Sequence, residues 1–142
     1  ADRVVIMDRG RVLQQGSLRD VLRNPRNRQT ARLLGYRNFF DIQILDGQAV
    51  SDLGRWPHAD SHRNPTLAAS FAEDFLAISD PNGFAVVQTC RWEARHIHIH
   101  ARYNEETFEA YAEEELLPGQ RFTLAVLYPP ALIGEKESEG KT

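Results

Sequence analysis

The sequence predicts a mainly β protein, a small barrel or sandwich preceded by a β-hairpin and two short helices. From Asn38 onward, apolar residues tend to recur at every second position in runs of about five to eight residues. Clusters of Gly, Asp, Asn and Pro separate these runs. Short strands at regular spacing with turn residues between them favour a small barrel or sandwich over a helical bundle.

The N-terminal segment is expected to begin with a hairpin. Residues 3–15 contain two apolar runs that meet at Asp8-Arg9-Gly10, where the glycine can adopt the positive φ of a tight turn. The polar turn between two β-type runs is the signal for antiparallel pairing.

Two short helices are expected after the hairpin. Ser17 is a suitable N-cap for the first, and Pro25 ends it because the residue before proline is disfavoured in the α region. Its apolar residues at helical spacing are Leu18, Val21 and Leu22. The second helix is expected over residues 26–34, with Gly35 as its C-terminal stop. The residues expected on its inner face are Thr30, Leu33 and Leu34.

The remaining chain is expected to consist of strands, turns and one longer loop. The strands are expected near residues 38–45, 48–52, 66–70, 85–91, 93–103, 107–112 and 121–127. The turns are expected at residues 46–47, 81–83, 104–106 and 117–120. Residues 56–65 are polar and contain two prolines, which predicts a loop.

Composition limits the function classes. The 142 residues carry a net charge of -3, so there is no basic surplus to neutralise a phosphate backbone, and nucleic acid is not expected as a partner. A single cysteine, Cys90, cannot form a disulfide within the chain, which favours the cytoplasm. No apolar run approaches the roughly 18 to 20 residues that a transmembrane helix needs. Because the first residues resemble the middle of a folded element, we expect the chain to be a piece of a longer protein.

The opening of the chain resembles the end of the ATPase domain in ATP-binding cassette (ABC) importers for oxyanions, sugars and polyamines. That family has an Ala-Asp-Arg entry, a turn ending in glycine, a Gln-x-Gly strand end, a proline stop and a helix ending at glycine. The corresponding residues here are Ala1-Asp2-Arg3, Gly10, Gln14-Gln15-Gly16, Pro25 and Leu34-Gly35.

The rest of the chain resembles the accessory domain of these subunits, an oligonucleotide/oligosaccharide-binding-like (OB-like) β-barrel. Residues 35–38 match its Gly-x-x-Asn entry, and residues 117–133 match its closing segment, which holds the final strand, a Leu-x-Pro-Gly turn and a Pro-x-x-Leu ending. A characteristic motif of the family is represented by Glu73 and Asp74, with Phe71 in place of its arginine. The resemblance implies an ATPase tail over residues 1–35 and a barrel domain over residues 36–134. Residues 135–142 are charged and are expected to be disordered.

The resemblance implies a regulatory and dimerisation domain in the ATP-binding subunit of an importer. The partners implied are a second copy of the subunit, as a homodimer, and the membrane permease subunits, at the cytoplasmic face of the cell membrane. Three features favour the molybdate or sulfate branch of the family: Asn38, the Leu53-Gly54 segment and Pro129-Pro130. The full-length subunit would bind ATP and Mg²⁺. The chain itself has no G-x-x-x-x-G-K-[ST] phosphate loop, so no catalytic residue and no ATPase activity are expected of it.

A ligand-sensing role is the alternative, and a row of histidines is its sharpest candidate. Strand alternation places His96, His98 and His100 on one face, where they could chelate a metal ion, and Ile97 and Ile99 on the other. Strict alternation would put Glu93, the nearest carboxylate, on the isoleucine face. The competing interpretation buries the isoleucines and leaves the histidines as a solvated or interface strip.

A second candidate is an oxyanion site at Arg37 and Asn38. An arginine and exposed backbone amides at this entry could hold a dianion such as molybdate or sulfate. The competing interpretation is structural: the Asn38 side chain bonds local backbone and the residue starts the first strand of the barrel domain.

Two further groups are given structural roles. The aromatic residues expected in the core are Phe39, Phe40, Phe71, Phe75, Phe84 and Trp92. The acidic residues expected on a solvated edge are Glu105, Glu106, Glu109, Glu113, Glu114 and Glu115.

Overall fold

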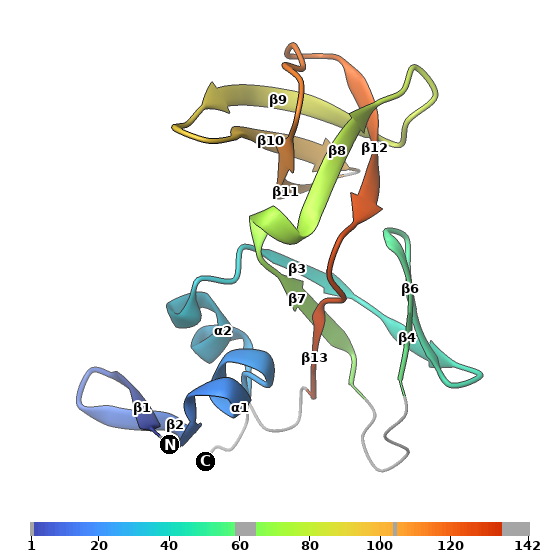
Figure 1. Cartoon of the computed structure of the whole chain (residues 1–142). Helices are drawn as coiled ribbons and strands as arrows, with labels where there is room; N and C mark the ends of the chain where they lie inside the picture. The colour runs from blue at the N-terminus through green and yellow to red at the C-terminus, as the bar shows by residue number, and fades with distance from the viewer. Residues whose placement is uncertain (1, 59–64, 104, 135–142) are drawn as a thin grey trace. The chain divides into compact units, whose positions relative to one another are not determined.

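The computed structural model describes residues 2–58, 65–103 and 105–134. The chain divides into two compact units, one made of residues 1–69 with 131–142 and the other of residues 70–130. Strands dominate both units, and the second contains a closed barrel, so the predicted mainly β fold is confirmed (Figure 1). The predicted boundaries after residues 35 and 134 stay predictions, and the tail expected to be disordered lies outside the described residues. No helix in the described segments is long and apolar enough to cross a bilayer.

The first unit begins with the predicted hairpin. Strand β1 (Arg3–Asp8) pairs antiparallel with β2 (Arg11–Ser17). Arg9 and Gly10 connect them with φ values of 54° and 79°. Two consecutive positive φ angles match the right-handed twist of a two-residue hairpin, which explains the glycine.

The two predicted helices are present and capped. Helix α1 (Leu18–Arg23) begins after Ser17, whose side chain accepts a hydrogen bond from the Asp20 amide at 3.2 Å. Helix α2 (Arg28–Leu34) starts two residues later than expected because Asn27 caps it, accepting from the Thr30 amide at 2.9 Å. It ends at Gly35 in the left-handed conformation, as predicted.

The inner face predicted for α2 is partly wrong. Thr30 is buried as expected, but Leu33 is 52% exposed and Ala31 takes the buried position. In α1 only Val21 is buried, while Leu18 and Leu22 are exposed. The apolar residues at helical spacing therefore outnumber those that the described part of the chain buries on these two helices.

Two small sheets complete the first unit. One has the strand order β13 (Ala131–Ile133), β7 (Leu67–Ser70), β3 (Asn38–Asp41). The other is the meander β4 (Gln43–Leu45), β5 (Gln48–Ser51), β6 (Gly54–Pro57). The strand predicted over residues 38–45 is thus two strands, separated at the buried Ile42. Residues 56–57 belong to β6 rather than to the predicted loop, and β13 was not predicted.

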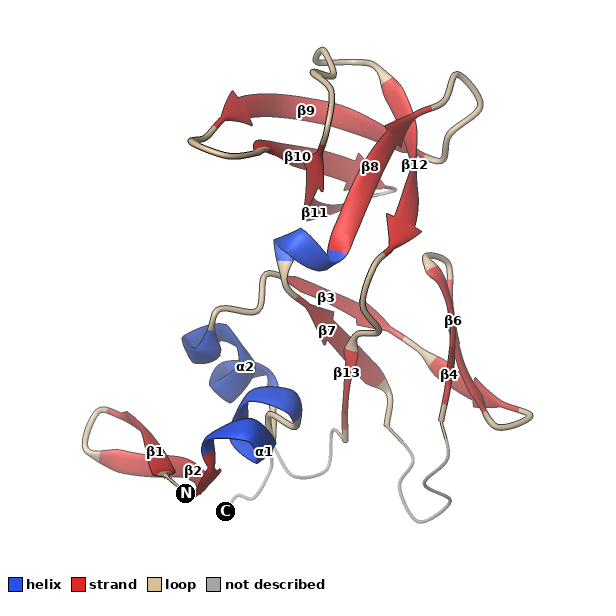
Figure 2. Ribbon diagram, viewed as in Figure 1, coloured by secondary structure: helices blue, strands red, loops and turns tan. Residues whose placement is uncertain are grey.

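The second unit contains a closed five-stranded barrel, visible in Figure 2. Its strands are β8 (Phe75–Ser79), β9 (Ala85–Trp92), β10 (Ile97–Tyr103), β11 (Glu106–Ala112) and β12 (Arg121–Val126). They close in the order β10-β11-β8-β12-β9, with β8 and β11 parallel and the other neighbours antiparallel. A short 3₁₀ turn, η1 (Ala72–Asp74), precedes β8, a strand that was not predicted.

Alternation along the barrel strands fills its interior. The large buried side chains are Phe75, Val87, Ile97, Ile99, Phe108 and Phe122. Phe108 contacts Phe75 edge-on and Phe122 at a tilt, with ring centroids 6.4 and 6.1 Å away. Of the six aromatic residues predicted for the core, Phe75 is fully buried. The prediction for Trp92 is wrong, because this residue lies at the end of β9 and its side chain is 65% exposed. The four others are half-buried.

Candidate metal-binding site

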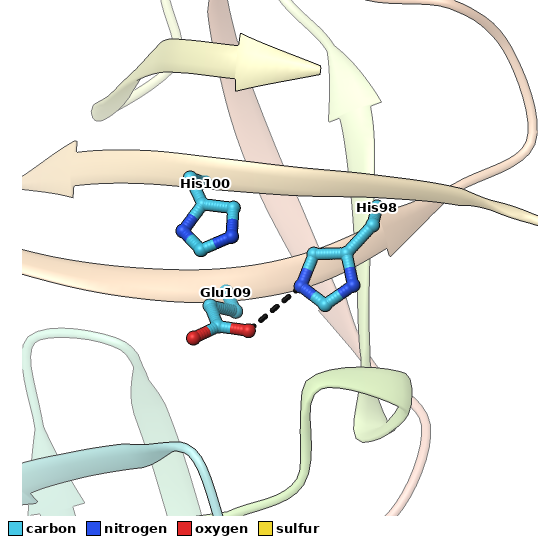
Figure 3. A group of neighbouring side chains, drawn as sticks. All are labelled: His98, His100 and Glu109. Carbon is cyan, nitrogen blue, oxygen red and sulfur yellow. Dashed lines mark hydrogen bonds and ion pairs between the residues drawn. The ribbon is translucent and has the colours of Figure 1, made fainter. Parts of the chain in front are cut away.

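Three side chains that can bind metal meet on the outer face of two barrel strands. In the antiparallel pair β10–β11, His100 lies directly opposite Glu109, and His98 lies two residues from His100 on the same face. One ligand atom from each of these residues lies within 4.8 Å of the others. Figure 3 shows the two imidazoles and the carboxylate turned toward one another. We call this group the His-Glu cluster.

The cluster is shielded from solvent on one side. His98 is only 8% exposed, and His100 and Glu109 are half-buried. His98 Nε2 forms a 2.7 Å hydrogen bond with Glu109 Oε1. The His100 ring stacks on that of His98, with centroids 5.1 Å apart. Pairing and stacking therefore fix the orientation of both rings.

Glu93 lies beside the cluster, and its predicted placement on the isoleucine face is wrong. The expected strand over residues 93–103 starts only at Ile97, because Glu93 to His96 form a turn closed by the Glu93 amide and the His96 carbonyl at 2.8 Å. This turn frees Glu93 from strand alternation. One of its oxygens lies 3.4 Å from His98 Nδ1 and the other 2.8 Å from His96 Nε2.

Charge and burial shape the surroundings of these groups. Hydrogen bonds from the Arg91 guanidinium hold the pKa of Glu93 below its ordinary value against the opposing effect of desolvation, and His96 adds to the lowering. Burial raises the pKa of the Tyr111 phenol, and the nearby carboxylates raise it further. The Tyr111 ring stacks on His96 at 4.0 Å and meets His98 edge-on at 5.4 Å.

The structure separates the three predicted histidines. His98 and His100 belong to the His-Glu cluster, whereas His96 is engaged by Glu93 and Tyr111 outside it. Ile97 and Ile99 are buried, as predicted. Of the competing interpretation, a solvated or interface strip, the solvated part is wrong for His98, which is buried among its partners, and the interface part stays a prediction.

Glu109 was assigned to a solvated acidic edge, and that assignment is wrong. It is half-buried against His98, while the other members of that acidic group are exposed. The sequence signal was incomplete: strands near residues 93–103 and 107–112 joined by a short turn predict an antiparallel pair. The turn expected at residues 104–106 would put Ala110 opposite His100, whereas the observed pairing of Tyr103 with Glu106 puts Glu109 there.

The predicted oxyanion residues lie in the first unit. Asn38 starts β3, as predicted, and only 1% of its surface is exposed. Arg37 precedes the strand and is exposed. Contact of the two with an anion stays a prediction.

By its fold, the chain is a β-rich protein whose closed five-stranded barrel carries the His-Glu cluster. No protein-family model matches the chain. It is 32% identical over 81 residues to the Fe(3+) ions import ATP-binding protein of Pseudomonas fluorescens, a match that covers 56% of this chain and 23% of that protein. It is 35% identical over 46 residues to the spermidine/putrescine import ATP-binding protein of Haemophilus ducreyi, covering 32% of this chain and 12% of that protein.

The chain therefore spans less than a quarter of the length of these curated relatives. Both similarities support the resemblance to the C-terminal part of ATP-binding subunits of ABC importers. The two relatives are named for different cargoes, so the similarity concerns the ATP-binding subunit and not its transported substrate.

Proposed function

We propose that this chain is the regulatory and dimerisation part of the ATP-binding subunit of an ABC importer. The observation that carries the proposal is the similarity to ATP-binding proteins of two different importers. The order of elements supports it, because a hairpin and two capped helices precede the barrel unit, as the resemblance implies.

The hairpin supports a place within a larger ATPase domain. Val5, Met7 and Val12 are about half exposed, and Met7 lies opposite Val12 across the pair β1–β2. Val4 and Ile6 point to the other face and are half-buried. A two-stranded hairpin with apolar residues on both faces is not stable by itself in water and needs cover on both sides. In this proposal the ATPase core of the same subunit covers the exposed face.

The barrel then serves as the accessory domain. Two copies hold a pair of ATPase domains together as a homodimer, and the full subunit binds ATP and Mg²⁺ and works with membrane permease subunits at the cytoplasmic face. Sedimentation of the chain over a range of concentrations tests the dimer. A strict monomer at the highest concentration would contradict the dimerisation role.

Molybdate or sulfate is the cargo class that we propose from the sequence features at Asn38, Leu53-Gly54 and Pro129-Pro130. Calorimetric titration with molybdate, tungstate and sulfate tests whether the chain binds such a cargo. Saturable heat that Arg37→Ala removes is the expected result. Flat titrations with all three anions would reject an oxyanion-sensing role for this chain.

A chimera tests the family role directly. The matched segment of the Pseudomonas fluorescens protein is replaced by this chain, and ATP hydrolysis and iron import are measured in the assembled transporter. We expect the chimera to hydrolyse ATP and import iron faster than a version of the transporter that lacks the segment. Met7→Asp should lower assembly by charging the uncovered hairpin face, whereas Arg11→Ala, a change at an exposed polar residue of the same hairpin, should not. Activity no higher than that of the truncated version would overturn the proposal.

The His-Glu cluster favours a second candidate, in which the barrel also senses a small ligand. Its residues all come from the second unit, so this candidate can be tested without any transporter.

A further inference from the structure

We infer that His98, His100 and Glu109 form a binding site for one divalent transition-metal ion of the zinc class. Its three ligands lie on strands β10 and β11 of one unit, so metal binding can be tested whether or not the proposed transport role holds.

The donor set selects the type of metal. Two imidazole nitrogens and one carboxylate oxygen form a ligand set that suits zinc and its neighbours, whereas calcium and magnesium prefer oxygen ligands alone. Three protein ligands leave a fourth tetrahedral position for water or an added ligand. The chemistry therefore points to an open site rather than a closed structural one.

The distances are close to those that a metal ion requires. Zinc binds nitrogen and oxygen at about 2.0 to 2.2 Å, which places tetrahedral ligands about 3.4 Å from one another. The ligand atoms now lie within 4.8 Å of one another. An ion would draw the more distant ligand atoms together by roughly 1.5 Å at most and separate the 2.7 Å pair of His98 Nε2 and Glu109 Oε1 by roughly 0.7 Å, shifts that small side-chain rotations can supply.

The hydrogen bond inside the cluster can be exchanged for a metal ion. His98 Nε2 and Glu109 Oε1 are 2.7 Å apart and share a proton. A divalent cation can take the place of that proton, which either moves to Nδ1 beside Glu93 or, where Nδ1 already carries a proton, is released to solvent; the ion then satisfies the Nε2 lone pair and the carboxylate at the same time. The outer strand face, where His100 and Glu109 are only half-buried, leaves the ion a path from solvent.

The other nitrogen of His98 is already placed for a metal ligand. His98 Nδ1 is buried and forms no hydrogen bond with the residues that the structure describes, but Glu93 Oε2 lies 3.4 Å from it. A histidine that binds metal through one nitrogen commonly directs the other toward a carboxylate, which fixes the tautomer and the ring orientation. Glu93 is in turn held by Arg91 and His96. His96, one of the three histidines singled out by the sequence, thus acts through Glu93 and does not bind the ion.

Titration of the metal-free chain, without a polyhistidine tag, tests the site. Zinc chloride is added to the chain in a calorimeter, and cobalt(II) is added in parallel while its visible absorption reports the coordination geometry. We expect one ion per chain and a rise in melting temperature on saturation, because an ion that binds only the folded state stabilises it. Absence of heat, of a cobalt spectrum and of a melting shift would overturn the proposal without any variant.

Variants then distinguish the residues. His100→Ala and Glu109→Gln should each lower zinc affinity at least tenfold, and Glu106→Gln, an equal charge change at an exposed position of the same strand, should leave it unchanged. His96→Ala should lower affinity less than either ligand variant, because it removes only the support of Glu93. Circular dichroism of each metal-free variant confirms folding. Binding that survives His100→Ala and Glu109→Gln but is lost in His96→Ala would contradict the assigned ligands.

Discussion

The side-chain amide of Gln14 donates a hydrogen bond of 2.9 Å to the backbone carbonyl of Asn24. The carbonyl oxygen of the same side chain accepts from the Arg26 amide at 2.8 Å. Gln14 therefore joins strand β2 to the segment between α1 and α2, and it is nearly fully buried. The Gln-x-Gly feature, one of those in which this chain resembles importer ATPases, thus has a physical role in the folded segment.

Gln14→Ala should destabilise the N-terminal segment. It removes two partly buried hydrogen bonds, to the Asn24 carbonyl and from the Arg26 amide, at a combined cost of about 1 to 3 kcal/mol in the free energy of unfolding. Hydrogen exchange should show faster exchange of the Arg26 amide and of the amides of α2. The matched control is Gln15→Ala at the neighbouring exposed position. Equal exchange rates in both variants would show that the two Gln14 hydrogen bonds do not stabilise the N-terminal segment.

Local signals made the hairpin and both helices predictable. A positive-φ turn at Gly10, a capping Ser17 and a stop at Gly35 act within a few residues of their own position, so each can be recognised without knowing the fold. The exposed Leu33 shows the limit of this reasoning. Apolar spacing marks a face that can be buried, but only the packing partner decides whether it is.

Pairing between distant segments could not be predicted in the same way. Strand β8 follows η1 in a stretch with neither glycine nor proline between Pro65 and Pro81, so neither of the two strongest turn residues marks its start. It is held by pairing with β11 and β12 across the barrel. Glu109 was missed for a related reason, since its role depends on the register of β10 against β11 and not on its own sequence neighbours.

Gly83→Ala should destabilise the barrel. A Cβ at this position would overlap the backbone of Phe122, a strand residue of the core that cannot move aside. Its φ lies outside the left-handed region, so the cost comes from this overlap alone and is about 3 kcal/mol. Gly16→Ala is the control, because its Cβ would meet Val21 at an ordinary 3.5 Å. Chemical denaturation compares the two, and similar midpoints would contradict the close approach.

Asp74 makes a pH dependence testable. Burial raises the pKa of its carboxyl above the ordinary 3.8, although the Phe71 amide opposes the shift. Between 3.8 and the raised pKa, the folded state binds more protons than the unfolded state. The contribution of Asp74 to stability must therefore fall as pH rises through this window.

Asp74→Asn removes this titration while keeping an oxygen that can accept from the Phe71 amide. Relative to the wild type, the variant should gain stability as pH rises from acid to neutral, and the difference should level off above the raised pKa. Denaturant titrations of both proteins across this range measure it. A difference that stays constant with pH would show that the carboxyl has the same pKa in both states.

The His98–Glu109 pair should be energetically coupled even without metal. Each side chain is mostly buried and the two share a hydrogen bond of 2.7 Å, so removing either one breaks this bond in a mostly buried site. In the presence of a chelator, His98→Leu and Glu109→Leu should each lower the free energy of unfolding by more than half of the loss in the double variant. The expected coupling energy is about 1.5 to 3 kcal/mol, the range for a hydrogen bond to a charged group. The free energies of unfolding of the four proteins give this coupling directly. Strict additivity would mean that the pair contributes nothing in the metal-free fold, and that its close contact is no preorganisation for an ion.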